Sequence, residues 1–168
     1  GSLGQLGSKI IETLKSTFKL KHLSRKDLDF RDLDNVVRIL NLLNPNIVIN
    51  CIAYTNVDKA EELIEEAYLI NSKLPAILSS WTNENKAYLV HFSTDYVFDG
   101  KKTSPYLESD ITNPLSIYGL SKSEGDDIIL KTAKRALILR SGWIYSHTHS
   151  SFLTKILEKI KNKETLHV

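Results

Sequence analysis

The stretch NIVINCIA, residues 46–53, is a continuous run of apolar and β-branched side chains with the length of one strand. The runs AYLVHFS at 87–93 and ALILR at 136–140 have the same character. A strand that is apolar throughout, rather than on alternate residues, is typical of a parallel sheet covered on both faces. These three runs therefore predict three buried parallel strands.

Helical periodicity separates these runs. Amphipathic helices are predicted at 8–15, 36–43, 57–71, 75–85, 116–134 and 150–161. Asp32 or Asp34 can cap the second helix, and Asn44 with Pro45 ends it. Residues 18–23 have the pattern of a further short strand. The alternation of strands and helices predicts an α/β fold, a Rossmann-type doubly wound parallel sheet.

Composition describes a single globular domain over residues 1–168, because hydrophobic content is 42% and charged content 25%. The net charge of +2 comes from scattered lysines, so we expect no nucleic-acid partner. The sequence has no transmembrane-length apolar segment and no signal peptide, so we expect no membrane partner. Cys51 is the only cysteine, which suits a reducing cytoplasm.

Both ends of the chain predict truncation. The chain has no methionine and begins with glycine. A glycine-rich phosphate loop normally follows the first, central strand of the sheet, but here the glycines begin at residue 1. At the other end, Thr165–Val168 resembles the start of another strand. We therefore expect the domain to lack its first strand and most of a C-terminal substrate-binding portion.

The pattern Gly1-x-x-Gly4-x-x-Gly7 directly precedes a predicted helix. Glycines let the backbone approach a pyrophosphate, whose charge then meets the amides at the helix N-terminus. A flexible terminus is the alternative for the glycines alone. About twenty residues on, where NAD sites carry a carboxylate, the chain has Ser24, Arg25 and Lys26. Unless this is an ordinary solvated basic loop, it favours the 2′-phosphate of NADPH, with NADH possible.

Tyr118 and Lys122 are four residues apart on a predicted helix, so both lie on one face. A tyrosine has a pKa of about 10 and is a poor proton donor at neutral pH. A nearby lysine cation and an oxidised nicotinamide are expected to stabilise the phenolate and lower that pKa, and the pair can then protonate a carbonyl oxygen as hydride reaches its carbon. An ordinary surface pair is the alternative for this spacing alone.

Two further groups follow predicted strands, where open α/β sheets bind their ligands. Thr94 lies directly after the second strand and can hold a substrate carbonyl for Tyr118. Trp143 follows the third strand and can stack on a sugar or fill the core. His147 and His149 alternate in a polar loop without nearby carboxylates or thiols, so we expect no metal site.

Together these motifs resemble the extended short-chain dehydrogenase/reductases, and in particular the dTDP-4-dehydrorhamnose reductases as a group. The resemblance covers nearly the whole chain. Its segments are GSLGQLG (1–7), LDFRD (28–32), NPNIVINCIAYTNVDKAE (44–61), STDYVFDG (93–100), NPLSIYGLSKSEGD (113–126) and RSGWIY (140–145).

The resemblance implies a catalytic triad of Thr94, Tyr118 and Lys122, with Tyr118 as the acid that assists reduction of a sugar-nucleotide 4-ketone by NADPH. It implies that Gly1, Gly4, Gln5, Leu6, Gly7, Ser24, Arg25, Asp29, Phe30, Ile52, Ala53, Thr55, Tyr118 and Lys122 bind the cofactor. It implies that Val57, Thr94, Asp95, Tyr96 and Trp143 face a nucleotide-sugar substrate. A homodimer is possible in such a reductase.

Two alternatives to a working reductase stay open. One is a non-catalytic NADP-binding regulatory protein of the same fold, in which the triad residues have survived. The other is an inactive fragment of the reductase.

Overall fold

The computed structural model describes residues 1–146 and 152–164, and the side chains of all of these except Phe152. Residues 1 and 23–142 form one compact unit, and residues 2–22 with the chain from Trp143 onward form a second. Each unit is considered by itself below. The predictions for His147, His149 and Thr165–Val168 lie outside the described residues.

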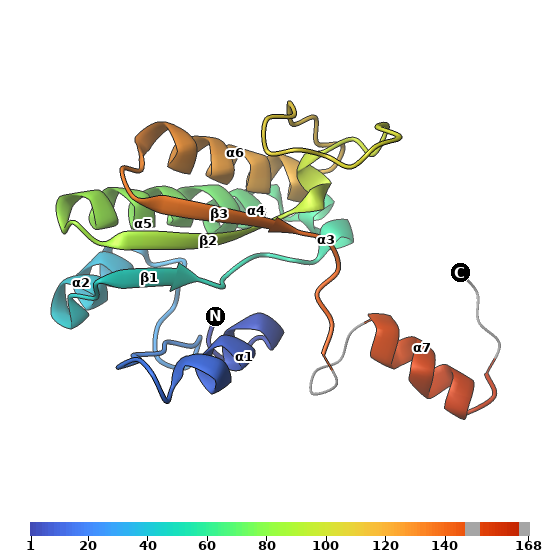
Figure 1. Cartoon of the computed structure of the whole chain (residues 1–168), viewed down its shortest axis with the longest axis horizontal. Helices are drawn as coiled ribbons and strands as arrows, with labels where there is room; N and C mark the ends of the chain where they lie inside the picture. Colours follow the sequence, from blue (N-terminus) through green and yellow to red (C-terminus); the bar gives the residue numbers. More distant parts are fainter. Residues whose placement is uncertain (147–151, 165–168) are drawn as a thin grey trace. The chain divides into compact units, whose positions relative to one another are not determined.

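The first unit contains a parallel three-stranded sheet in the order β1-β2-β3 (Figure 1). Its strands are β1 (Ile47–Asn50), β2 (Tyr88–Thr94) and β3 (Ala136–Ser141). Each falls within or next to one of the three apolar runs, so the predicted α/β fold with a Rossmann-type parallel sheet is confirmed. The register places Asn50 beside His91 and Thr94 beside Ser141.

The first unit also contains most of the helices. They are α2 (Leu33–Leu43), α3 (Val57–Glu62), α4 (Ile64–Tyr68), α5 (Leu74–Glu84) and α6 (Ile117–Thr132), with a π-helical turn over Leu69–Lys73 between α4 and α5. As predicted, the Asp32 side chain caps α2 by accepting from the Asn35 N–H, and the helix ends at Asn44 in the left-handed conformation.

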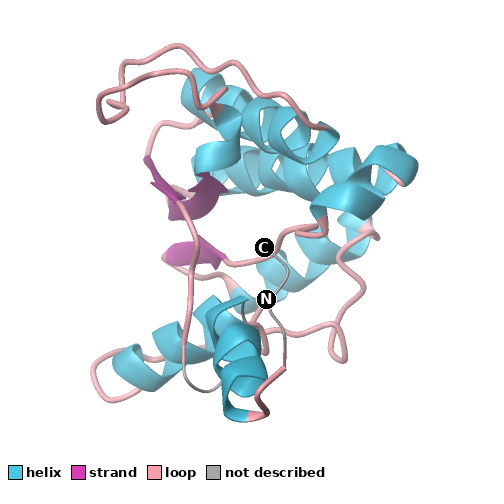
Figure 2. Cartoon of the chain, turned by 90° about the vertical axis from the view of Figure 1, so that its right-hand side faces the viewer, coloured by secondary structure: helices cyan, strands magenta, loops and turns pink. Residues whose placement is uncertain are grey.

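The core lies where α5 and α6 cover one face of the sheet (Figure 1). Leu74 of α5, Leu89 of β2 and Ile129 of α6 are almost completely buried there. Figure 2 views the same sheet from the carboxyl ends of its strands, where Thr94 lies. The layered packing therefore brings the end of β2 next to the first turn of α6.

The second unit contains α1 (Gln5–Leu14) and α7 (Phe152–Lys161). The strand predicted at 18–23 is wrong: these residues form no strand. A strand needs a neighbour to complete its hydrogen bonds, and in the described part of the chain no strand pairs with this segment. Within residues 1–146 and 152–164, no helix is both long and apolar enough to cross a membrane.

Candidate functional site

Thr94 and Tyr118 meet at the carboxyl end of β2. Thr94 is the last residue of the strand, and Tyr118 lies in the first turn of α6, whose N-terminus is capped by the Ser116 side chain. The Thr94 side chain lies near enough to the Tyr118 phenol to act on its pKa, which it lowers. The structure therefore brings together two of the three residues predicted to be catalytic.

Tyr96 and Gly119 hold this end of α6 close to the segment after β2. The rings of Tyr96 and Tyr118 meet edge to face, with centroids 5.5 Å apart. A Cβ on Gly119 would lie 2.4 Å from the Tyr96 carbonyl oxygen, so only glycine allows this approach. Thr94 also accepts a hydrogen bond from the Tyr96 N–H (3.2 Å) and donates one to Asp95 (3.1 Å). Asp95 and Tyr96, two predicted substrate residues, thus lie directly beside the Thr94–Tyr118 pair.

Lys122 is buried, and its amine contacts β2. Its Nζ lies 2.7 Å from the carbonyl oxygen of Phe92 and 3.1 Å from Nε2 of His91. Burial raises the pKa of Tyr118, although the nearby Thr94 side chain opposes this. Lys122 is not among the causes of this shift, and the lowering of the Tyr118 pKa by Lys122 together with an oxidised nicotinamide stays a prediction.

A cluster of buried polar side chains surrounds Lys122. We call it the Lys122 network, and it consists of Asn50, His91, Ser93, Lys122, Asp126 and Arg140. Asp126 Oδ2 accepts from Ser93 Oγ (2.8 Å) and Arg140 Nε (3.1 Å). Its Oδ1 is buried and has no hydrogen-bond partner among the described residues.

Burial dominates the electrostatics of this network. It lowers the pKa of Lys122 to about 8, with the charge of Asp126 opposing the shift, and lowers the pKa of His91 to about 3. Burial also raises the pKa of Asp126, against its bonds to Ser93 and Arg140. Sequence reasoning missed Asn50, His91 and Asp126. The available signal was a polar side chain inside an otherwise apolar strand, as at Asn50 and His91.

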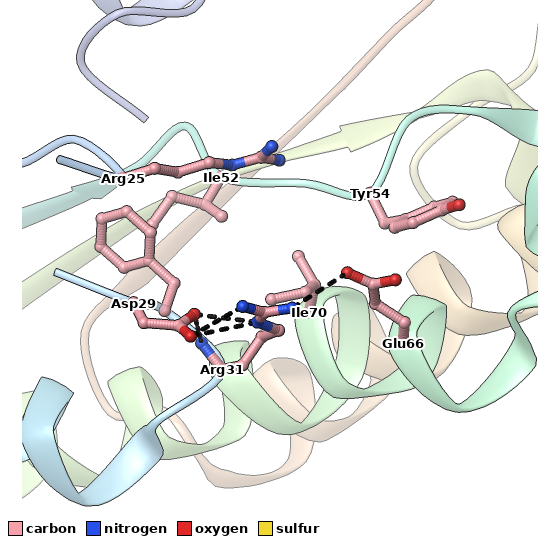
Figure 3. A pocket seen from close by; sticks show the side chains of 8 residues that line it. Arg25, Asp29, Arg31, Ile52, Tyr54, Glu66 and Ile70 are labelled. Atoms are coloured by element: carbon pink, nitrogen blue, oxygen red, sulfur yellow. Dashed lines mark hydrogen bonds and ion pairs between the residues drawn. The ribbon is translucent and has the colours of Figure 1, made fainter.

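A pocket of about 270 Å³ opens elsewhere in the first unit (Figure 3). We call it the arginine pocket. It is lined by Arg25, Asp29, Phe30, Arg31, Ile52, Tyr54, Glu66 and Ile70. Four of these were predicted cofactor residues from separate parts of the sequence: Arg25, Asp29, Phe30 and Ile52. The structure brings these four together.

Arg31, which sequence reasoning missed, organises the charged side of the arginine pocket. Its guanidinium is bonded to both carboxylate oxygens of Asp29 and lies 4.0 Å from Glu66 (Figure 3). The Arg31 hydrogen bonds lower the pKa of Asp29. Ser24, in contrast, is buried, donates to Asp27 (2.7 Å) and is not among the residues that line the pocket, so its cofactor role stays a prediction.

Asn71 fixes the backbone beside the arginine pocket. Its side chain accepts from the Tyr54 N–H (2.9 Å) and donates to the Tyr54 carbonyl (3.1 Å) and to Ser121 of α6 (3.0 Å). This clamp holds the segment that contains the predicted cofactor residues Ile52, Ala53 and Thr55, just before Val57 begins α3. Asn71 was missed because its position in a helical pattern carried no sign of this contact.

The glycine-rich turn is divided between the two units. Gly1 lies in the first, where a Cβ on it would be 2.4 Å from the Cys51 carbonyl oxygen. Gly4 is the N-cap of α1 in the second unit, and Gln5, Leu6 and Gly7 form its first turn. Within the described residues, Ser2 Oγ and Gln5 Nε2 are buried without a hydrogen-bond partner. Trp143 also belongs to the second unit, and its side chain is largely exposed.

Comparison with known proteins extends these observations over the whole chain. A family model described as the RmlD substrate binding domain matches residues 1–168. The dTDP-4-dehydrorhamnose reductase of Aggregatibacter actinomycetemcomitans is 35% identical over all of this chain and 58% of its own length.

Solved structures agree with this relationship. A dTDP-4-dehydrorhamnose reductase from Clostridium acetobutylicum superposes with a TM-score of 0.92 at 36% identity, over 96% of this chain and 58% of its own. One from Bacillus anthracis, in complex with NADP, gives 0.91 at 31% identity with the same coverage. The chain thus spans a little over half the length of these relatives. It belongs to the RmlD substrate binding domain family.

Proposed function

We propose that this chain carries the cofactor-binding and proton-transfer part of a dTDP-4-dehydrorhamnose reductase. The reaction is the reduction by NADPH of the 4-keto group of dTDP-4-dehydro-rhamnose to dTDP-rhamnose. The observation that carries the proposal is that Thr94 at the end of β2 and Tyr118 in the first turn of α6 lie together, in a chain that its family matches throughout. We expect it to work in the cytoplasm on a nucleotide sugar, with a homodimer possible.

The chain has groups that fit a dinucleotide phosphate. The arginine pocket offers apolar walls from Ile52 and Ile70 and the cation of Arg25, which suit an adenosine with a 2′-phosphate. In the glycine-rich turn, Ser2 Oγ and Gln5 Nε2, which have no hydrogen-bond partner in the described part of the chain, offer hydrogen bonds to a pyrophosphate. The B. anthracis relative was solved with NADP. We therefore propose NADPH as the cofactor, with NADH possible.

The proposed chemistry assigns a role to each member of the triad. When bound, the reduced nicotinamide supplies a hydride to the ketone carbon. Thr94 hydrogen-bonds the ketone oxygen, and the Tyr118 hydroxyl donates its proton to that oxygen, so the ketone becomes an alcohol. Lys122, one helical turn along α6 from Tyr118, is proposed as the third member of the triad. Val57, Asp95, Tyr96 and Trp143 are proposed to contact the sugar.

The test is NADPH oxidation in the presence of dTDP-4-dehydro-rhamnose. It uses this chain and a chimera in which a relative supplies the segments outside the match. Turnover by the chimera is expected, and its absence would remove the reductase proposal. Tyr118→Phe is expected to lower kcat about 10²-fold or more while NADPH still binds. Unchanged turnover in Tyr118→Phe would contradict the role of Tyr118. NADPH binding without any turnover would instead support the non-catalytic alternative.

A further inference from the structure

A chain of hydrogen bonds runs from the backbone at Ile52 to the amine of Lys122. The Ile52 N–H donates to Asn50 Oδ1 (3.0 Å), and Asn50 Nδ2 lies 3.0 Å from His91 Nδ1. His91 Nε2 then lies 3.1 Å from Lys122 Nζ. Asn50 and His91 are register partners on β1 and β2, and both are buried, so water does not compete for these bonds.

This chain of hydrogen bonds has a direction because the backbone N–H at Ile52 can only donate. It selects Oδ1 of Asn50 as the acceptor, which leaves the Asn50 NH₂ to donate to Nδ1 of His91. A neutral imidazole that accepts at Nδ1 carries its proton on Nε2. That proton points at Lys122 Nζ, and only a neutral amine has a lone pair to receive it. The intact chain therefore requires an uncharged Lys122.

A charged Lys122 requires the opposite direction. An ammonium group only donates, so His91 must accept at Nε2 and carry its proton on Nδ1. Asn50 must then turn its oxygen toward His91, which leaves its NH₂ facing the Ile52 N–H. Two donors cannot bond, so the Ile52 N–H loses its acceptor. Protonation of Lys122 thus costs one hydrogen bond at Ile52.

The remaining charges near Lys122 keep both states accessible. Asp126 lies on α6 itself, Arg140 of β3 is bonded to Asp126, and His91 on β2 stays neutral because burial and Lys122 lower its pKa to about 3. The facing residue of β1 is Asn50, which does not titrate. Burial lowers the pKa of Lys122 to about 8, while Asp126 acts in the other direction. The amine therefore changes charge within the range in which the protein can be studied.

We propose that Asn50 and His91 are positioning residues that couple the charge of Lys122 to the backbone at Ile52. When the amine is neutral, the hydrogen bonds are donated in the direction from Ile52 to Lys122. When the amine gains a proton, the direction of donation reverses and the Ile52 N–H loses its acceptor. Ile52 lines the arginine pocket (Figure 3), so a ligand in that pocket and the proton on Lys122 influence each other. This last consequence rests on the proposed function, whereas the reversal does not.

The test is an NMR titration of the full 168-residue chain from pH 6 to 10. The imidazole nitrogens of His91, the Lys122 amine and the Ile52 amide are followed together. The His91 proton is expected on Nδ1 at low pH and on Nε2 at high pH. The tautomer change, the Ile52 amide shift and the Lys122 titration should share one midpoint. A single His91 tautomer across the whole range would overturn the proposal, as would an Ile52 amide that does not follow Lys122.

Two carboxylate–amide exchanges give a matched comparison. In Asn50→Asp the carboxylate can only accept, so His91 should stay protonated on Nδ1 at every pH. The Lys122 midpoint should then rise by about one pH unit, which corresponds to one ordinary hydrogen bond. Asp126→Asn removes a nearby negative charge, so the midpoint should fall while the tautomer change persists. A persistent tautomer change in Asn50→Asp would contradict the proposal. If that variant does not fold, the wild-type titration decides.

A binding measurement separates this inference from the proposed function. If NADPH occupies the arginine pocket, its Kd should change with pH around the Lys122 midpoint, and this dependence should disappear in Asn50→Asp. If NADPH does not bind at all, the proposed function fails, but the NMR titration still tests the hydrogen-bond chain.

Discussion

The Lys122 network and the arginine pocket each contain an aspartate bonded to an arginine, yet the pKa values of the two carboxyl groups are shifted in opposite directions. Asp126, whose side chain is 0% exposed, has a raised pKa because burial outweighs its bond to Arg140. Asp29, whose side chain is 53% exposed, has a lowered pKa because its bonds to Arg31 outweigh burial. An aspartate–arginine pair in the interior is therefore costly to break, because its partner stays buried. The exposed pair at the pocket contributes little to stability.

The largest difference between the two regions is expected in stability. Asp126→Ala leaves Ser93 and Arg140 without their acceptor, so it should lower the free energy of unfolding by about 3 kcal/mol. This value lies at the low end for buried pairs because Arg140 is partly exposed. Asp29→Ala, the matched change at the arginine pocket, should have little effect. Urea unfolding of both variants measures the loss of unfolding free energy. Equal losses would contradict the expected difference between the two aspartates.

The second expected effect is a pH dependence of the unfolding free energy, and it comes from the buried Lys122. The pKa of Lys122 is lowered from 10.5 to about 8 in the folded chain. Between these values the unfolded chain binds a proton that the folded chain does not, so unfolding free energy should rise with pH. The rise should total about 3 kcal/mol between pH 8 and 10.5, and Lys122 should add no pH dependence below about pH 8. Urea unfolding from pH 7 to 11 measures it.

Lys122→Met is the control for this pH dependence, because it keeps the buried stem and removes the titrating group. The difference in unfolding free energy between wild type and Lys122→Met should rise with pH. A difference that stays constant from pH 8 to 10.5 would show that Lys122 keeps its charge in the folded chain.

A third, smaller effect concerns the contact between α6 and the end of β2. Gly119→Ala places a Cβ 2.4 Å from the Tyr96 carbonyl oxygen, so α6 must shift at a cost of about 2 kcal/mol. The shift should also disturb the Thr94–Tyr118 pair and lower turnover more than cofactor affinity. Leu120→Ala, at the exposed next position, is the matched control and should change neither. Calorimetry together with kcat and NADPH Kd separates the two outcomes.

The smallest expected effect belongs to the arginine pocket. If Arg25 binds a 2′-phosphate, Arg25→Ala should weaken NADPH binding roughly tenfold and leave NADH binding unchanged. Lys73→Ala, an exposed lysine outside the pocket lining, is the control. Fluorescence titration with both cofactors measures the ratio of affinities. Equal weakening of both cofactors would show that Arg25 does not read the phosphate.

Sequence patterns predicted the framework well because they depend on local periodicity. The three strands and the caps at Asp32 and Asn44 were predicted and found. The strand at 18–23 was not found, because a segment with a strand pattern becomes a strand only when another strand lies beside it. Local sequence carries no information about that neighbour.

The candidate site could be predicted only in part. Thr94 and Tyr118 were expected to meet because one ends a strand and the other begins the following helix. The Asn50–His91 contact depends on the register between β1 and β2, and the Arg31–Glu66 contact joins segments far apart in the chain. Neither pair has a characteristic spacing, so no motif indicated them.

The amino-acid pattern was enough to predict the parallel α/β framework and the chemical groups at the strand ends. Periodicity decides which residues are buried, and a side chain at the end of a strand is presented wherever that strand lies. Only the tertiary structure decided the state of those groups. Lys122 was expected as a catalytic cation beside Tyr118, and packing of α6 on β2 buries its amine against Phe92 and His91. Its charge is set by this surrounding interior, because desolvation and hydrogen-bond direction are properties of the packed chain and not of the residue.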